Sequence, residues 1–164
     1  MSSIDRYLRM TRRFEVPPEK VFDAWTDPAW TKQWLFTSPT SQNDTKLDLH
    51  VGGKWRIADI RDGVTYVANG EYLEVDRPNK LVFTFSMPQF SPNSDTITVE
   101  LVADGAGCVM TFTQSGIDIA KEIEATPEGE MGGSEHGWTL MFLGLKDLVE
   151  TGKVNWPPEM LPKD

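Results

Sequence analysis

The segment from Ser134 to Glu150 constrains the fold more than any other part of the sequence. Its apolar residues recur at three- and four-residue steps, a spacing typical of an α-helix of about four turns with one apolar face. Ser134 is placed to cap the start of this helix, and Gly152 follows its end as a stop signal. The apolar face is wide, and we expect a large apolar surface to cover it. Its members are Trp138, Met141, Phe142, Leu145, Leu148 and Val149.

The chain before this helix alternates between apolar and polar residues in several short runs, which is the pattern of half-buried β-strands. A long first strand is predicted over residues 4–16, and two prolines end it. Two short helices follow, one over residues 18–26 and one that starts at Asp27-Pro28. Further strands are predicted over residues 47–51, 54–60, 64–75, 81–86, 96–102 and 108–114.

Turn signals separate these runs. Asp62-Gly63 predicts a two-residue hairpin between two strands. Residues 38–45 are polar throughout and predict a loop. Residues 116–133 are rich in glycine and glutamate, and we expect a loop there with at most a helical turn.

Asn69-Gly70 falls inside the predicted strand 64–75 without a polar break beside it. We therefore interpret it as a β-bulge and not as a second hairpin. Because a bulge reverses the inward face of a strand, the sequence leaves open whether Tyr72 or Leu73 points inward.

Sequential strands joined by short turns form an antiparallel meander, and one face of such a sheet needs a cover. Only the last helix is long enough. The predicted fold class is therefore α+β: a curved antiparallel sheet of about six or seven strands that grips one long C-terminal helix, with two short helices besides. We expect a single domain over residues 1–164, with an ordered core over about residues 4–152. The proline-rich residues 153–164 should form an extended tail.

The composition narrows the function. With 25 acidic and 16 basic residues the formal charge is −9, which argues against a nucleic-acid partner. A single cysteine, Cys108, and the absence of a signal peptide or a membrane-length apolar run favour the cytoplasm. His50, His136 and Cys108 lack the spacing of metal ligands, and no phosphate-binding loop occurs. We expect neither a metal nor a cofactor, and the sequence leaves a homodimer open.

Several motifs in order resemble one family. These are TRRFEVPPEKVFDAWTDPAWTKQW, GGKWRI, GEYLEVDRPNKLVFTF, and VMTFTQSGI followed by GWTLMFLGLKDLVE. They are similar to the activator of heat-shock protein 90 ATPase homologue-like proteins, within the superfamily of START domains, polyketide cyclases and the Bet v 1-like major birch-pollen allergen (SRPBCC). The resemblance implies a helix-grip fold with an apolar cavity between the sheet and the long helix. We do not expect a heat-shock chaperone as partner, because the chain begins at the first strand and carries no separate N-terminal domain for chaperone contact.

The aromatic-rich faces of the predicted helix and sheet favour binding of an apolar or aromatic small molecule over catalysis. A large void should be filled by side chains, water or a ligand, since empty apolar space destabilises a fold. The predicted ligand-binding residues are Trp138, Met141, Phe142 and Leu145 from the helix, Trp55, Ile57, Tyr66, Phe83, Phe85, Val99 and Phe112 from the sheet, and Trp34 as a lid.

Three polar residues are candidates for orienting a ligand in the cavity. Arg56 and Glu71 lie on neighbouring predicted strands, where a cross-strand ion pair is the plainer interpretation. His136 lies at the start of the long helix. Two alternative functions remain open: a cyclase- or hydrolase-type enzyme that uses His136, Glu71 or Tyr66 as acid or base, and a chaperone-interaction module.

Overall fold

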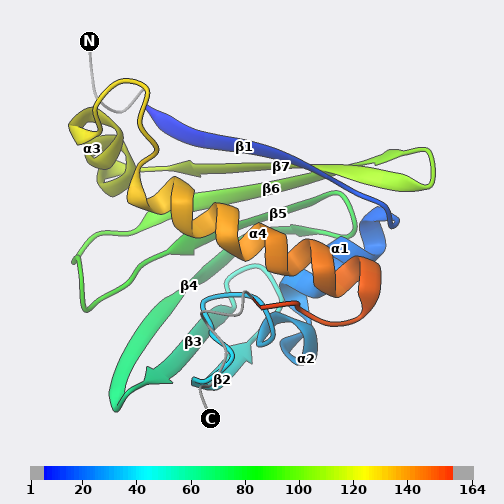
Figure 1. Cartoon of the computed structure of the whole chain (residues 1–164), viewed down its shortest axis with the longest axis horizontal. Coiled ribbons are helices and arrows are strands. Elements are labelled where there is room, and N and C mark those ends of the chain that lie inside the picture. Colours follow the sequence, from blue (N-terminus) through cyan, green and yellow to red (C-terminus); the bar gives the residue numbers. More distant parts are fainter. Residues whose placement is uncertain (1–5, 157–164) are drawn as a thin grey trace.

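A curved antiparallel sheet of seven strands carries the long helix across its concave face (Figure 1). The computed structural model describes residues 6–156. Its strands are β1 (Tyr7–Phe14), β2 (Gln42–Leu47), β3 (Lys54–Arg61), β4 (Val64–Asp76), β5 (Lys80–Phe85), β6 (Asp95–Asp104) and β7 (Gly107–Ser115). Its helices are α1 (Pro18–Thr26), α2 (Pro28–Thr31), α3 (Ile117–Ala125) and α4 (Gly133–Thr151). The predicted helix-grip fold class is confirmed.

The sheet order is β1-β7-β6-β5-β4-β3-β2, so every neighbour from β2 to β7 is also a neighbour in sequence. Only β1 closes a long-range pair, with Met10 opposite Phe112 in β7. The hairpin predicted at Asp62-Gly63 is present. Both residues have positive φ, 51° and 79°, as a two-residue turn between twisted strands requires.

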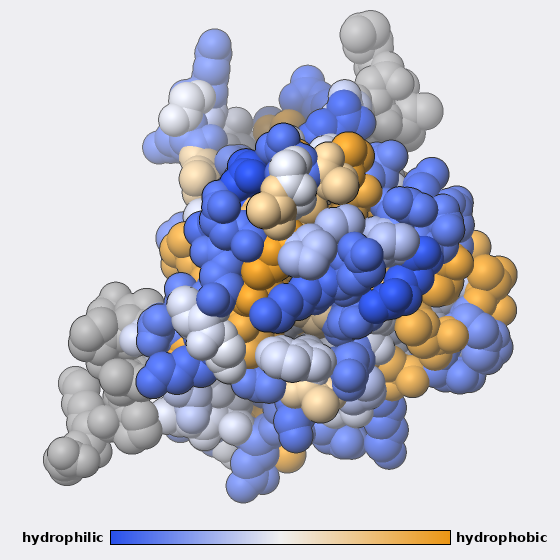
Figure 2. Space-filling view, turned by 90° about the vertical axis from the view of Figure 1, so that its right-hand side faces the viewer, coloured by the Kyte–Doolittle hydropathy of each residue, from blue (hydrophilic) through white to orange (hydrophobic). Residues whose placement is uncertain are grey.

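Alternate residues of the strands other than β2 are buried and form the core. Leu8, Met10 and Phe14 of β1 are buried, whereas Tyr7 is about half exposed. The opposite face of the sheet carries the polar residues. The side of the molecule in Figure 2 is mainly hydrophilic, with hydrophobic residues in smaller patches between the charged ones. None of the helices within residues 6–156 is long and apolar enough to cross a bilayer.

The loop predicted over residues 38–45 is present only through residue 41, and residues 42–45 belong to a strand instead. β2 spans Gln42–Leu47 and pairs only with β3, so it is an edge strand that tolerates polar residues on both faces. The strand predicted over residues 47–51 is wrong, because the chain turns there. Gly53 makes that turn possible, since a Cβ on it would lie 1.9 Å from the carbonyl oxygen of Asp48.

The bulge in β4 lies at Leu73 and not at Asn69-Gly70. Pairing with β3 continues without a break through Gly70, and the register against β5 shifts between Tyr72 and Glu74. Tyr72 therefore points inward at 3 % exposure, whereas Leu73 is 44 % exposed. Gly70 allows close approach, because a Cβ on it would lie 1.8 Å from the carbonyl oxygen of Thr84.

A nine-residue helix, α3, takes up the first half of the loop predicted over residues 116–133, and residues 126–132 form a loop as predicted. Its first N–H groups are satisfied by a residue on another element. The buried carboxylate of Asp95, at the start of β6, accepts hydrogen bonds from the backbone of Asp118 at 3.3 Å and of Ile119 at 3.1 Å. Because this cap comes from more than 20 residues upstream, no local capping signal marks the helix.

The long helix ends as predicted but begins differently. Gly152 stops it with φ of 92°, whereas Ser134 does not cap it. The helix begins at Gly133, and the carboxylate of Glu122 on α3 accepts the backbone N–H of Ser134 at 3.0 Å. The ends of two predictions, the first strand before Arg6 and the extended tail after Trp156, lie outside the described residues.

Asp95 should couple stability to pH. Burial raises the pKa of its carboxyl, and the hydrogen bonds from Gln114 and from the start of α3 only partly offset that rise. A folded-state pKa above the unfolded one means that the folded protein holds this proton more tightly. The contribution of Asp95 to stability therefore rises as pH falls through its folded-state pKa. We expect urea unfolding from about pH 7 to about pH 4 to show wild type gaining stability relative to Asp95→Asn.

Asp118 provides the matched control. Hydrogen bonds from Asn93 and Ser91 lower the pKa of its carboxyl, so its contribution to stability is lost as pH falls through the folded-state pKa. The stability of wild type relative to Asp118→Asn should therefore stay level from about pH 7 to about pH 5 and decline only as the pH falls below about 4, where the unfolded chain takes up the proton first. Parallel pH trends for the two variants would contradict the assignment.

Candidate functional site

The space between α4 and the centre of the sheet is filled by aromatic rings. Trp25 of α1 lies at the middle of this cluster, 4.7 Å from Trp34 between ring centroids in an edge-on arrangement. Phe112 of β7 lies 4.5 Å from Trp138 and 5.2 Å from Phe142, both on α4. Such tilted and edge-to-face contacts are favourable geometries for aromatic pairs. Two short segments, one strand and the long helix therefore meet through one set of rings.

Little empty volume remains in this interior. A small void of about 10 Å³ lies beside this cluster and is lined by Trp25, Leu35, Leu47, Trp55, Tyr72, Leu81 and Phe83. This volume is about what a single water molecule needs. The indole N–H of Trp25 is buried without a hydrogen-bond partner among the described residues. The large hollow predicted at the centre of the grip is therefore absent from this structure, because side chains occupy it.

A larger cavity of about 510 Å³ opens on one side of α4. α4 forms one wall, the segment after α2 forms the floor, and the chain after α4 closes one end. Most of its lining is apolar, and Leu140 and Leu143 of α4 are 48 % and 58 % exposed there. The lining residues are Trp34, Phe36, Thr37, Arg61, Met87, Gly137, Leu140, Met141, Leu143, Gly144, Lys146, Asp147, Val154, Asn155 and Trp156.

Phe36 connects the floor of this cavity to the aromatic interior. Its backbone has φ of 51°, an uncommon conformation for a residue with a side chain. The ring stacks on Phe85 at 5.3 Å and meets Trp138 edge-on at 5.4 Å, while its N–H points to the sulfur of Met141 at 3.4 Å. These contacts hold the cavity floor against both the sheet and α4.

A buried carboxylate fixes the polar end of the cavity. Asp59 of β3 is 1 % exposed, and its Oδ1 accepts hydrogen bonds from Thr37 at 3.2 Å, Ser41 at 2.8 Å and Asn43 at 3.3 Å. Its Oδ2 accepts the Nε–H of Arg61 at 2.5 Å. The loop between α2 and β2 is thereby tied to the end of β3.

The predicted ligand-binding residues divide between the cavity and the interior. Trp34 and Met141 line the cavity. Phe85 and Tyr66 are half buried. The others are buried in the packed interior, and these are Trp55, Ile57, Phe83, Val99, Phe112, Trp138, Phe142 and Leu145.

The three predicted polar groups do not meet. Arg56 is exposed and stands opposite Asn69 in the β3–β4 register, on the face of the sheet away from α4. The predicted Arg56–Glu71 ion pair is wrong, because the register places Glu71 opposite Lys54, whose ammonium lies 2.6 Å from its carboxylate. His136 is exposed in the first turns of α4.

Sequence reasoning missed the residues that distinguish the cavity, chiefly Phe36, Arg61, Leu140 and Leu143. The two leucines carried a usable signal, since they are apolar but lie outside the buried stripe of α4. Arg61 carried none, because its role depends on where the loop before β2 returns to the sheet.

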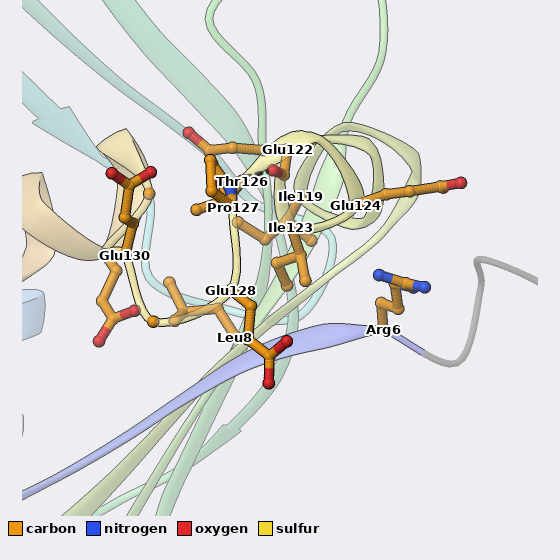
Figure 3. Close-up of a pocket in the computed structure, with 13 residues that line it drawn as sticks. Arg6, Leu8, Ile119, Glu122, Ile123, Glu124, Thr126, Pro127, Glu128 and Glu130 are labelled. Carbon is orange, nitrogen blue, oxygen red and sulfur yellow. Dashed lines mark hydrogen bonds between the residues drawn. The ribbon is translucent and has the colours of Figure 1, made fainter.

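A second hollow, of about 350 Å³, lies where α3 and the loop after it cover β1. Figure 3 shows several glutamates around it, with Leu8 and Ile123 at its base. Glu122 is engaged at the start of α4, and the side chains of Glu124 and Glu128 point in different directions (Figure 3). Among residues 6–156 no group of three acidic, histidine or cysteine side chains is arranged to hold a metal ion.

Comparison with known proteins gives the family. Residues 15–150 match the family model described as activator of Hsp90 ATPase homolog 1-like protein. The chain belongs to this family. The resemblance of the sequence motifs is thereby confirmed, and the match includes α4 and the cavity floor but stops before the chain segment that closes the cavity.

Solved structures agree with this Hsp90 ATPase homolog 1-like assignment at the level of the fold. Protein CV1439 from Chromobacterium violaceum is 23 % identical with a TM-score of 0.73, and the alignment covers 89 % of this chain and 98 % of that one. A Staphylococcus aureus protein of unknown function, SA2116, is 26 % identical with a TM-score of 0.69, covering 90 % and 96 %. An Arthrobacter aurescens protein is 17 % identical with a TM-score of 0.74, covering 91 % and 88 %. No curated protein matches the sequence.

The packed interior of this family member should be sensitive to loss of a single ring. Phe112 is fully buried among Trp25, Trp138 and Phe142. We expect Phe112→Ala to lower the free energy of unfolding by about 3–5 kcal/mol, because it removes contacts and leaves a void. Urea unfolding monitored by tryptophan fluorescence measures this loss.

Phe90→Ala is the control, because Phe90 is 68 % exposed. It should change the unfolding free energy by less than about 0.5 kcal/mol. Similar losses in the two variants would show that the rings between α4 and the sheet are not the stabilising core.

Proposed function

We propose that this protein binds an apolar or aromatic small molecule in the cavity beside α4. The observation that carries the proposal is a mainly apolar cavity of about 510 Å³, which is within the range of small-molecule sites. The cavity has few polar groups, and most of its surface is apolar. This arrangement suits a ligand with an apolar body and few polar atoms.

Exposed apolar surface on α4 supports the same proposal. Leu140 and Leu143 stand on the cavity wall and remain exposed, although most large apolar residues of α4 are buried. Covering apolar area is worth roughly 25 cal/mol per Å², so a ligand that covers both leucines and the ring of Phe36 gains appreciable binding energy. Family membership supports the proposal as well, because proteins of this family typically bind hydrophobic ligands.

The enzyme alternative receives no support from the geometry. General acid–base chemistry requires the acting groups within reach of one reacting point. His136 and Glu71 are on different elements, one on α4 and one paired with Lys54 on the sheet, and Tyr66 packs against Phe90 at 6.3 Å. We therefore propose ligand binding and no catalytic role.

Gly137 offers a direct test of the cavity. A Cβ built on this residue meets nothing within 4 Å, although Gly137 lines the cavity wall. The side chain of Gly137→Leu should therefore project into this open space and occupy part of the cavity, and better helix propensity should raise stability by up to about 1 kcal/mol. We expect fluorescence titration with the neutral probe N-phenyl-1-naphthylamine to show affinity reduced by at least about tenfold, which is about 1.4 kcal/mol.

Lys121→Leu on α3 is the control, since Lys121 is exposed and does not line the cavity. It adds the same apolar side chain elsewhere and should leave probe affinity unchanged. A probe that binds wild type and Gly137→Leu equally well, or that fails to bind folded wild type at all, would contradict the proposed site.

A further inference from the structure

Arg61 is held at the edge of the cavity in a fixed orientation. Its Nε–H donates to the buried carboxylate of Asp59 at 2.5 Å, and its guanidinium carbon lies 5.4 Å from the ring centre of Tyr66. Both contacts restrict the side chain, although it remains 42 % exposed. The Arg61 side chain is therefore preorganised, and it loses little conformational entropy when it binds a ligand.

The outer donors of this guanidinium make no hydrogen bond to any residue that the structure describes. Within residues 6–156, all hydrogen bonds of the Arg61 side chain come from Nε. The two terminal nitrogens keep four N–H donors in one plane, which is the geometry that matches a carboxylate or phosphate. Asp59 does not occupy these terminal donors. Its Oδ2 accepts from Nε, and its Oδ1 accepts hydrogen bonds from Thr37, Ser41 and Asn43.

The other charges of the cavity are committed elsewhere. Lys146 lies 2.6 Å from Glu150 and donates to the carbonyl oxygen of Arg13 at 3.2 Å. Asp147 accepts the backbone N–H of Asn155 at 3.2 Å, near the end of α4. The β3–β4 turn next to Arg61 lies at the lower left of Figure 1, away from that end of the helix. A ligand anion at the Arg61 end therefore meets the terminal donors of a guanidinium whose Nε is paired with the buried Asp59, and the carboxylate that lines the cavity itself, Asp147, lies at the other end.

From this geometry we propose that the ligand is an amphipathic anion, whose carboxylate or phosphate pairs with Arg61 while its apolar body lies against α4 and Phe36. The proposal rests on the binding function proposed above and adds the chemical class of the ligand. Arg61 is the residue that selects for charge. Asp59 is a positioning residue, because it contacts Arg61 and not the ligand.

Isothermal titration calorimetry with two matched probes tests whether the cavity prefers an anionic ligand to a neutral one. 4-Phenylbutyrate carries a carboxylate, and 4-phenylbutyramide has the same body with a neutral head. We expect wild type to bind the carboxylate at least about tenfold more tightly, as charge-assisted bidentate hydrogen bonds allow. Arg61→Gln should reduce this preference to less than about twofold and leave the affinity for the amide unchanged, which also shows that the cavity is intact.

Two further variants separate charge from position. Arg61→Lys keeps the charge but lacks the planar fork, so it should retain only part of the preference and serves if the glutamine variant does not fold. Arg56→Gln removes an arginine from the outer face of the same strand and should change nothing. Loss of the preference in Arg56→Gln would indicate a general charge effect and would overturn the proposal.

Two further comparisons complete the test: a phosphate in place of the carboxylate, and small anions that lack the apolar body. Phenylbutyl phosphate should also bind more tightly than the amide, and its ratio to phenylbutyrate identifies the preferred anion. Acetate and inorganic phosphate should bind far more weakly, because they lack the apolar body. Equal affinity of wild type for phenylbutyrate and its amide would overturn the charge assignment and leave the binding function standing, whereas binding of neither probe would contradict both.

Discussion

The packing of aromatic rings around Trp25 is the constraint on which the rest of the structure depends. The ring of Trp25 contacts rings from the segment after α2, from the sheet and from α4, at centroid distances between 4.7 Å and 6.4 Å. Its indole N–H is left without a partner among the described residues, a cost of about 1–3 kcal/mol for a buried donor. The ring contacts must exceed this cost, and they fix α1 between the helix and the sheet.

This packing decides where a ligand can bind. A helix-grip fold leaves space between its sheet and its long helix only if side chains do not fill it, and here the rings of Phe112, Trp138 and Phe142 occupy that space. The accessible volume lies beside α4, where Phe36 turns back toward the helix. Trp34, on the same segment, donates its indole N–H to the carbonyl oxygen of Ala24 at 2.8 Å and thereby fixes the start of the cavity floor.

The sequence predicts local features of this fold well. The three- and four-residue spacing along α4 and the alternation along the strands both reflect burial of side chains on one face. Asp62-Gly63 predicts its hairpin because the turn needs two positive φ values. The failures share a different cause. α3 depends on Asp95 from a distant strand, and β2 depends on pairing with β3. Neither partner is visible in the local pattern.

The candidate site was harder to predict for the same reason. Periodicity identifies which residues of a helix are buried, and Trp138, Phe142 and Leu145 are indeed buried. It does not say which buried residues border empty space. That depends on the path of other segments, and the loop held by Asp59 brings Thr37 to the cavity although Thr37 lies 22 residues before Asp59 in sequence.

Two glycines in α4 show how the helix itself contributes to the cavity. Gly137 and Gly144 are seven residues apart and therefore share a face of the helix. A Cβ at Gly144 would lie 3.4 Å from Val154, at ordinary van der Waals contact, whereas a Cβ at Gly137 would meet open space. Each glycine costs a helix interior about 1 kcal/mol relative to alanine. At Gly137 the missing side chain leaves the cavity open, and this space is what the glycine contributes in return for that cost.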